Sequence, residues 1–167
     1  MAHAKDLRAI GQSLEMTRIG VFELENHGES YLVRSRSITP TCQWIINNSL
    51  VAAVWDTPHS ALKGGEGWLR YEPQIISRLD AQGRKQRRSR VPAQVQAPNK
   101  PSQHLRTVGE HLDRVGASEF TISWDHPHSV TVNYQTSDGE NEQKKFSFEK
   151  LQELGFHMRF RRSTRSL

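Results

Sequence analysis

The sequence reads LRAIGQSLE at residues 7–15 and LRTVGEHLD at residues 105–113, 98 positions later. At the same offset Phe22 corresponds to Phe120 and Leu24 to Ile122. Self-similarity at a fixed offset is typical of an internal repeat, and it decides the architecture on which other motifs are placed. We therefore expect two related halves, each beginning with one copy of the motif.

Each copy has the pattern of an amphipathic helix. Leucine and isoleucine recur at helical spacing over residues 5–16, which predicts the first helix there. Gly11 lies inside this helix, where glycine costs about 1 kcal/mol relative to alanine. Because Gly109 takes the same position in the second copy, we expect both glycines to let the helix backbone lie close to a sheet or to another helix.

Alternating apolar and polar residues, bounded by turn residues, predict one β-hairpin in each half. Its strands are expected at residues 21–25 and 31–34, and in the second half at residues 120–124 and 130–134. A third strand is expected over 143–148, followed by a short helix that ends at Gly155. Residues 71–83 have the same helical pattern and close on Gly83.

Two segments have no counterpart in the other half. Residues 38–69 insert about twenty extra residues into the first half, and they predict one extra strand or short helix plus a mobile loop. Residues 84–102 begin with a basic run and continue with three prolines, which is the composition of a linker. The predicted organisation is a first α/β repeat over 1–83, this linker, and a second α/β repeat with a basic tail over 103–167.

The expected fold class is α+β, with two tandem α-β-β-(β)-α repeats packed pseudo-symmetrically and the helices on one face of antiparallel sheets. Each half alone would have a marginal core, which favours packing of the two on each other. The longest apolar run covers only residues 50–55, far short of a membrane span of about 20 residues. The polar N-terminus and the single cysteine predict a cytoplasmic protein in which Cys42 is buried as a small apolar side chain.

The net charge of +5 is concentrated in two segments that contain no acidic residue. The basic residues of the first are Arg84, Lys85, Arg87, Arg88 and Arg90, and those of the second are Arg159, Arg161, Arg162 and Arg165. Without these nine, 14 Lys and Arg remain against 18 Asp and Glu, so the rest of the chain is mildly acidic. Clustered guanidinium groups bind phosphates and release counterions from a nucleic acid backbone.

Each basic segment also has a simpler interpretation. The first could be a solvated continuation of the preceding helix, or it could dock on an acidic protein surface, including that of this chain. Residues 156–162 mix aromatic and basic side chains, as in surfaces that stack on single-stranded nucleic acid. Their strict alternation instead favours a final strand with the aromatic residues inward and the arginines outward.

No complete catalytic or metal-binding motif is present in the sequence. His126 and His128 lie in a predicted turn without further ligands at a familiar spacing, while His104 and His111 are expected at the surface or rim of the second helix. The glycine-rich loop at residues 63–68 lacks the Lys-Ser/Thr ending of a phosphate loop. The four tryptophans, at positions 44, 55, 68 and 124, are expected to be core or edge aromatics.

These patterns indicate a non-enzymatic protein without metal or other cofactor. The leading hypothesis is binding to the RNA or DNA backbone through Arg84, Lys85, Arg87, Arg88, Arg90, Arg159, Arg161 and Arg162. The alternative is a protein-interaction or assembly subunit, either with another protein or as a homo-oligomer, whose basic linker becomes ordered on its partner. A membrane partner is not expected.

Overall fold

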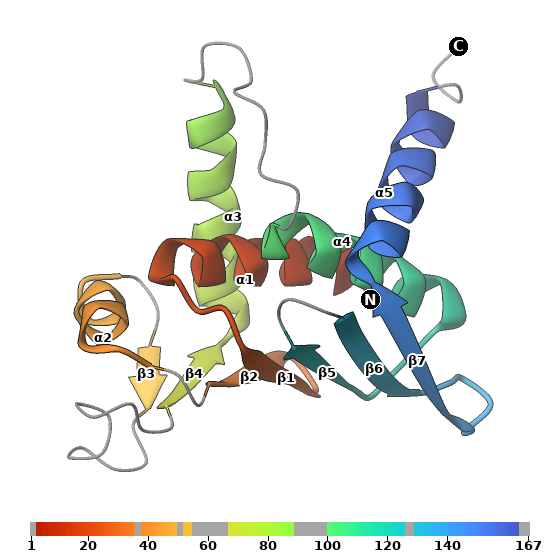
Figure 1. Cartoon of the computed structure of the whole chain (residues 1–167), viewed down its shortest axis with the longest axis horizontal. Coiled ribbons are helices and arrows are strands. Elements are labelled where there is room, and N and C mark those ends of the chain that lie inside the picture. The colour runs from red at the N-terminus through yellow and green to blue at the C-terminus, as the bar shows by residue number, and fades with distance from the viewer. Residues whose placement is uncertain are drawn as a thin grey trace.

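The computed structural model describes residues 3–35, 38–49, 52–54, 67–88, 100–125 and 129–163 (Figure 1). The helices are α1 (His3–Thr17), α2 (Pro40–Asn47), α3 (Pro73–Arg88), α4 (Pro101–Val115) and α5 (Phe148–Ser163). The strands are β1 (Phe22–His27), β2 (Ser30–Ser35), β3 (Ala52–Val54), β4 (Gly67–Tyr71), β5 (Phe120–Asp125), β6 (Ser129–Gln135) and β7 (Asn141–Ser147).

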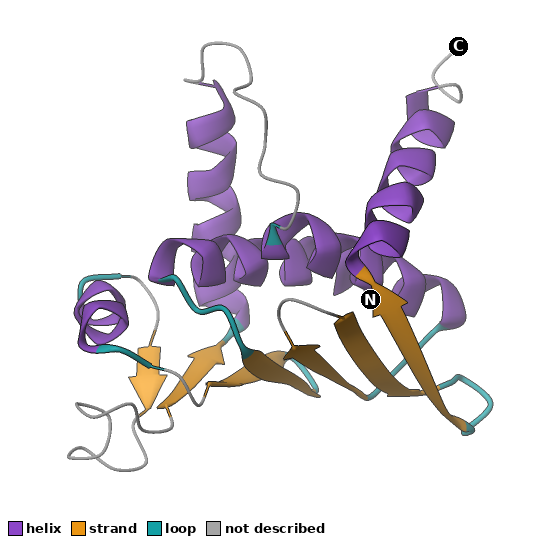
Figure 2. Ribbon diagram, in the orientation of Figure 1, coloured by secondary structure: helices purple, strands orange, loops and turns teal. Residues whose placement is uncertain are grey.

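The strands form one antiparallel sheet in the order β3-β4-β2-β1-β5-β6-β7. Helices α1, α3, α4 and α5 all lie on the same side of this sheet (Figure 2). The α+β class and the placement of the helices on one face are therefore confirmed. The two halves share the sheet, because β1 pairs with β5 and sets Leu24 opposite Ile122, two residues that are 98 positions apart.

Helices α1 and α4 carry the two copies of the motif, and they pack against each other through its glycines. A Cβ atom on Gly11 would lie 2.5 Å from the Cα of Ser102, and one on Gly109 would lie 2.6 Å from the Cα of Ala4. Since Ala4 and Ser102 are also 98 positions apart, the same contact is made twice with the two helices exchanged. The expectation that both glycines allow close backbone approach is confirmed.

The acidic residue that closes each copy of the motif caps the other helix. Asp113 accepts hydrogen bonds from the backbone N–H of His3 (2.9 Å) and of Ala4 (3.1 Å) at the start of α1. Glu15 accepts from the backbone N–H (2.9 Å) and the hydroxyl (2.6 Å) of Ser102 at the start of α4. The first N–H groups of a helix have no partner within the helix, so these carboxylates provide their hydrogen-bond acceptors. The negative charge of each carboxylate also interacts favourably with the positive end of the helix dipole.

We expect the Asp113→Ala variant to lose about 1 kcal/mol of unfolding free energy, the usual cost of removing a helix cap. Urea denaturation followed by circular dichroism would measure the loss. The control is Asp138→Ala, because Asp138 is exposed in the turn between β6 and β7. Equal stability of the two variants would contradict the capping role.

Two predicted helix ends are wrong, because α3 and α5 continue through Gly83 and Gly155 to Arg88 and Ser163. The strand predicted for residues 156–162 is consequently wrong as well, since these residues belong to α5. Gly83 is buried where α3 crosses α1, and a Cβ atom there would lie 2.5 Å from Oε1 of Gln12. Glycine within a helix costs only about 1 kcal/mol relative to alanine, so neither Gly83 nor Gly155 is enough to end its helix.

The insertion contributes both a helix and a strand where one or the other was predicted. Helix α2 begins with Thr39, whose side chain accepts a hydrogen bond from the backbone N–H of Cys42, and Pro40 follows in the first turn. Strand β3 pairs with β4, and β4 itself pairs with β2. Cys42 is buried, as expected.

The tryptophans have different environments. Trp124 lies in the core and stacks on Phe22 with 5.3 Å between ring centroids, whereas Trp44 on α2 is 68% exposed, so the core or edge prediction is wrong for Trp44. Trp68 on β4 is covered by the guanidinium of Arg34 at 4.1 Å. Trp55 and most of the glycine-rich loop lie outside the described residues.

Candidate nucleic-acid interface

The two basic segments are carried by the C-terminal turns of α3 and α5. Both helices leave the α1–α4 layer on the side away from the sheet (Figure 1). Arg84, Lys85, Arg87 and Arg88 lie in α3, and Arg159, Arg161 and Arg162 lie in α5. The structure therefore brings these seven predicted binding residues to one side of the molecule. Arg90 and Arg165 lie outside the described residues.

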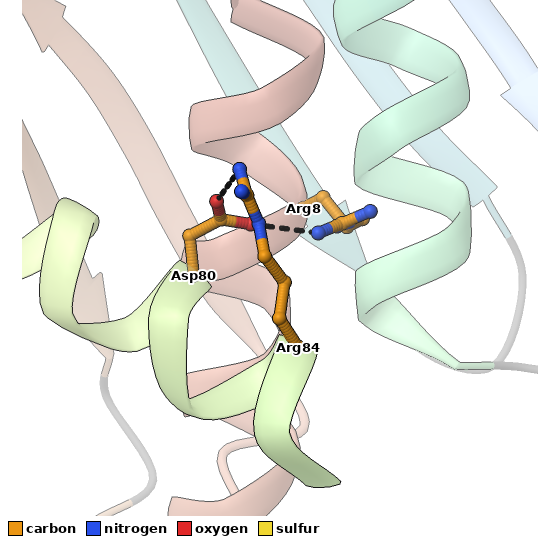
Figure 3. Close-up of polar contacts among 3 residues, drawn as sticks. All are labelled: Arg8, Asp80 and Arg84. Atoms are coloured by element: carbon orange, nitrogen blue, oxygen red, sulfur yellow. Dashed lines mark hydrogen bonds and ion pairs between the residues drawn. The ribbon is translucent and has the colours of Figure 1, made fainter. Parts of the chain in front are cut away.

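The base of α3 is fixed by a buried carboxylate between two arginines (Figure 3). Asp80 accepts a hydrogen bond from Arg8 of α1 at 2.7 Å and one from Arg84 at 2.6 Å. The side chain of Asp80 is only 4% exposed, whereas that of Arg84 is 66% exposed. Arg84 is thus held by an acidic residue of the same helix while it remains accessible to solvent, as is Lys85 beside it.

This three-residue cluster was only partly predictable. Arg106, which corresponds to Arg8 in the second copy of the motif, also has an acidic partner and pairs with Glu110 at 3.2 Å. The role of Asp80 was not predicted. The sequence contains one signal for it, because Asp80 precedes Arg84 by four residues and such pairs meet on one face of a helix.

A polar groove of about 420 Å³ separates α3 from α5. Its floor includes Arg8 of α1 and Arg106 of α4, and its walls include Gly83 of α3 and Gly155 of α5. Five glutamines also line it, at positions 12, 82, 86, 103 and 152. The lining contains Glu15 and Glu110 against Arg8, Lys100 and Arg106, so the groove has little net charge. The basic residues in excess belong instead to the last turns of α3 and α5.

The histidines do not form a metal site in the part of the chain that the structure describes. His104 is 2% exposed and stacks on Phe148 with 5.4 Å between ring centroids, so its predicted surface or rim position is wrong. His111 is half-buried and contacts the hydroxyl of Tyr134 at 3.3 Å. Burial lowers the pKa of His111, and the charges of Lys144 and Arg114 lower it further. His126 and His128 lie outside the described residues.

Across the described ranges, no three histidine, cysteine, aspartate or glutamate side chains are placed to hold a metal ion together. Over the same residues, none of the helices combines the length and the apolar character needed to cross a membrane. Comparison of the chain with protein-family models, with curated proteins and with solved structures finds no match. A functional assignment therefore depends on the geometry and charge of the chain itself.

Proposed function

We propose that this protein binds nucleic acid through contacts between the backbone phosphates and the basic ends of α3 and α5. The observation that carries the proposal is that two acid-free basic segments, far apart in the sequence, end two helices on the same side of the molecule (Figure 1). Arginine presents a planar fork of donors that matches phosphate oxygens, and each contact releases condensed counterions.

The spacing of the two helices favours a polymeric ligand. They start from β4 and β7, which are five strand positions apart in the sheet. At the usual spacing between neighbouring strands, the distance across the sheet from β4 to β7 is ~24 Å. A small anion cannot reach both basic ends at once, whereas a nucleic acid presents phosphates continuously over such a distance.

The helix ends themselves work against anion binding to a limited extent. The C-terminus of a helix carries a partial negative charge of roughly half an electron, which the nearest basic side chains neutralise. In α3, Arg84 is additionally paired with Asp80. Variants of the other basic residues of α3 and of those of α5 leave this pair intact, and they are therefore the ones used to test the proposal.

The proposal is tested by neutralising basic residues that are not in the Asp80 cluster. In one variant Lys85, Arg87 and Arg88 are replaced by glutamine, which preserves helix propensity. Binding to single-stranded and double-stranded RNA and DNA is measured by fluorescence anisotropy at increasing salt. If all three residues contact phosphates of a DNA duplex, the slope of log K against log salt should fall in magnitude by about 2.7. A second variant, with Arg159, Arg161 and Arg162 replaced by glutamine, should behave in the same way.

A matched control removes the same charge elsewhere, with Lys5, Lys145 and Lys150 replaced by glutamine. All three lysines are exposed and lie outside α3 and the last turns of α5. We expect the control to retain most of the salt dependence of the wild type. Absence of binding by the wild type, or an unchanged slope in both basic variants, would overturn the proposal.

An assembly role is the second candidate, and it can be tested at an exposed aromatic side chain. Trp44 on α2 and Phe156 on α5 are 68% and 63% exposed. A stable complex that survives nuclease treatment and is lost in the Trp44→Ala variant would support this second function.

A further inference from the structure

The outer edge of β7 is uncovered in the part of the chain that the structure describes. Strands β3 and β7 are the two edges of the sheet. In the first half, the short strand β3 of the insertion covers the outer side of β4. Strand β7 is the counterpart of β4 in the second half, and its residues 141–145 are all exposed. The insertion thus adds a strand beyond β4, whereas among the described residues no strand lies beyond β7.

The hydrogen-bonding pattern identifies which backbone groups point away from the sheet. The N–H of Thr136 donates to the carbonyl of Glu140 at 2.9 Å, next to the paired residues Gln135 and Asn141. Bonded and non-bonded pairs alternate along an antiparallel ladder, so the backbone N–H and C=O groups of Glu142 and Lys144 form hydrogen bonds with β6. The N–H and C=O groups of Asn141, Gln143 and Lys145 therefore point outward.

We propose that β7 pairs antiparallel with β7 of a second copy of this chain and forms a symmetric dimer with one continuous sheet. The two-fold axis would pass between the two Gln143 residues. Asn141 of each copy would then form a hydrogen-bonded pair with Lys145 of the other. Together with the Gln143 pair, this gives about six backbone hydrogen bonds, two for each bonded pair.

The charges on β7 select this register over its neighbours. With the axis at Gln143, Glu142 of each copy faces Lys144 of the other copy at a non-bonded position, where side chains are closest. Moving the axis to Lys144 or to Glu142 sets two identical charges opposite each other, which is unfavourable. One oxygen of Glu142 accepts a hydrogen bond from Tyr134 within the chain, and its other oxygen is available for this lysine.

The edge lacks most of the features that usually prevent strand addition. It pairs regularly with β6 from Asn141 to Ser147, with neither a proline nor a bulge. Lysines commonly protect an edge strand, but here Glu142 supplies a partner for one of the two. A self-complementary edge of this kind fits a second copy of the same chain better than an unrelated strand.

The proposed dimer has a consequence for the helices. A two-fold axis through a hydrogen-bonded pair runs perpendicular to the sheet, so both copies keep their helices on the same face. The basic ends of α3 and α5 from the two copies would then lie on one side of the dimer. The dimer itself does not depend on nucleic-acid binding.

A charge-swap experiment tests both the surface and the register. Sedimentation equilibrium of the full chain is measured over a wide concentration range for the wild type, K144E, E142K and the double variant E142K/K144E. The wild type should show a monomer–dimer equilibrium. Each single variant creates two like-charge pairs and should raise the dimer Kd about tenfold or more, while the double variant should restore it. K5E makes the same charge change on α1 and should leave the Kd unchanged.

A backbone variant gives an independent test if the charge variants are poorly folded. Gln143→Pro removes an outward N–H that the β6–β7 ladder does not use, and proline is tolerated at such edge positions. It should abolish the dimer while circular dichroism shows a folded chain. A wild type that stays monomeric, or a dimer that persists in both Gln143→Pro and K144E, would overturn the proposal.

Discussion

Replacing Asp80 by alanine is expected to lower the unfolding free energy of this protein by about 3 kcal/mol. The carboxylate is 4% exposed and joins Arg8 on α1 to Arg84 on α3, so its loss leaves the Arg8 guanidinium without its acidic partner (Figure 3). Removing one partner of a buried ion pair lowers the unfolding free energy by about 3–5 kcal/mol. We choose the lower value because the Arg8 side chain retains 17% exposure. Urea denaturation at neutral pH would measure the loss.

The two arginines provide the controls for this variant. Arg84→Gln removes a partner that is 66% exposed and should cost less than 1 kcal/mol. The double variant Asp80→Leu, Arg8→Met replaces the buried pair with apolar side chains, and it should recover much of the stability that Asp80→Ala loses. Equal stability of Asp80→Ala and Arg84→Gln would show that the buried carboxylate does not hold α3 to α1.

Much of the fold could be predicted from the sequence because its main elements show their own periodicity. The first helix and both hairpins follow from apolar spacing and turn residues. The pairing of β1 with β5 joins the two hairpins into one sheet, and no local pattern in the sequence predicts it. The glycines at positions 11 and 109 were assigned to close packing from their recurrence alone. Their actual contacts, with Ser102 and Ala4, depend on how two distant helices cross.

The wrong predictions came from local patterns that do not decide the structure on their own. Gly83 and Gly155 suit a helix end by composition, yet both lie inside longer helices beside the groove. Strict alternation over residues 156–162 favours a strand, yet these residues continue the helix that begins at Phe148. His104 is polar, but its ring is buried against Phe148 and Trp124.

The candidate interface was predictable as a set of residues and not as an arrangement. Charge alone identified the two basic segments, whereas their place on one side of the molecule depends on where α3 and α5 lie (Figure 1). Arg84 also pairs with Asp80, a contact that the charge of its segment alone does not predict. Charge patterns therefore indicate which residues to test, and the fold indicates which of their helices end on the same side of the molecule.

Replacing Gly109 by alanine is expected to destabilise the protein by about 2 kcal/mol, although alanine is the better helix former. The new Cβ atom would lie 2.6 Å from the Cα of Ala4, so α1 and α4 must move apart. Overpacking of this kind costs about 1–3 kcal/mol or more, which exceeds the gain in helix propensity of about 1 kcal/mol. Gly20→Ala is the control, because a Cβ atom at Gly20 meets nothing within 4 Å. It should be neutral or slightly stabilising. A Gly109→Ala variant as stable as this control would contradict the close crossing.

The double variant Gly11→Ala, Gly109→Ala distinguishes a shared crossing from two independent contacts. Gly11 meets the start of α4 and Gly109 meets the start of α1, so both substitutions push the same two helices apart. Once one alanine has separated the helices, the second finds part of the space already open. We therefore expect the double variant to lose less stability than the two single losses added together, by about 0.5 kcal/mol or more. Strict additivity would mean that each helix end adjusts separately. The two glycine contacts would then be energetically independent, and they would not be coupled through the crossing of α1 and α4.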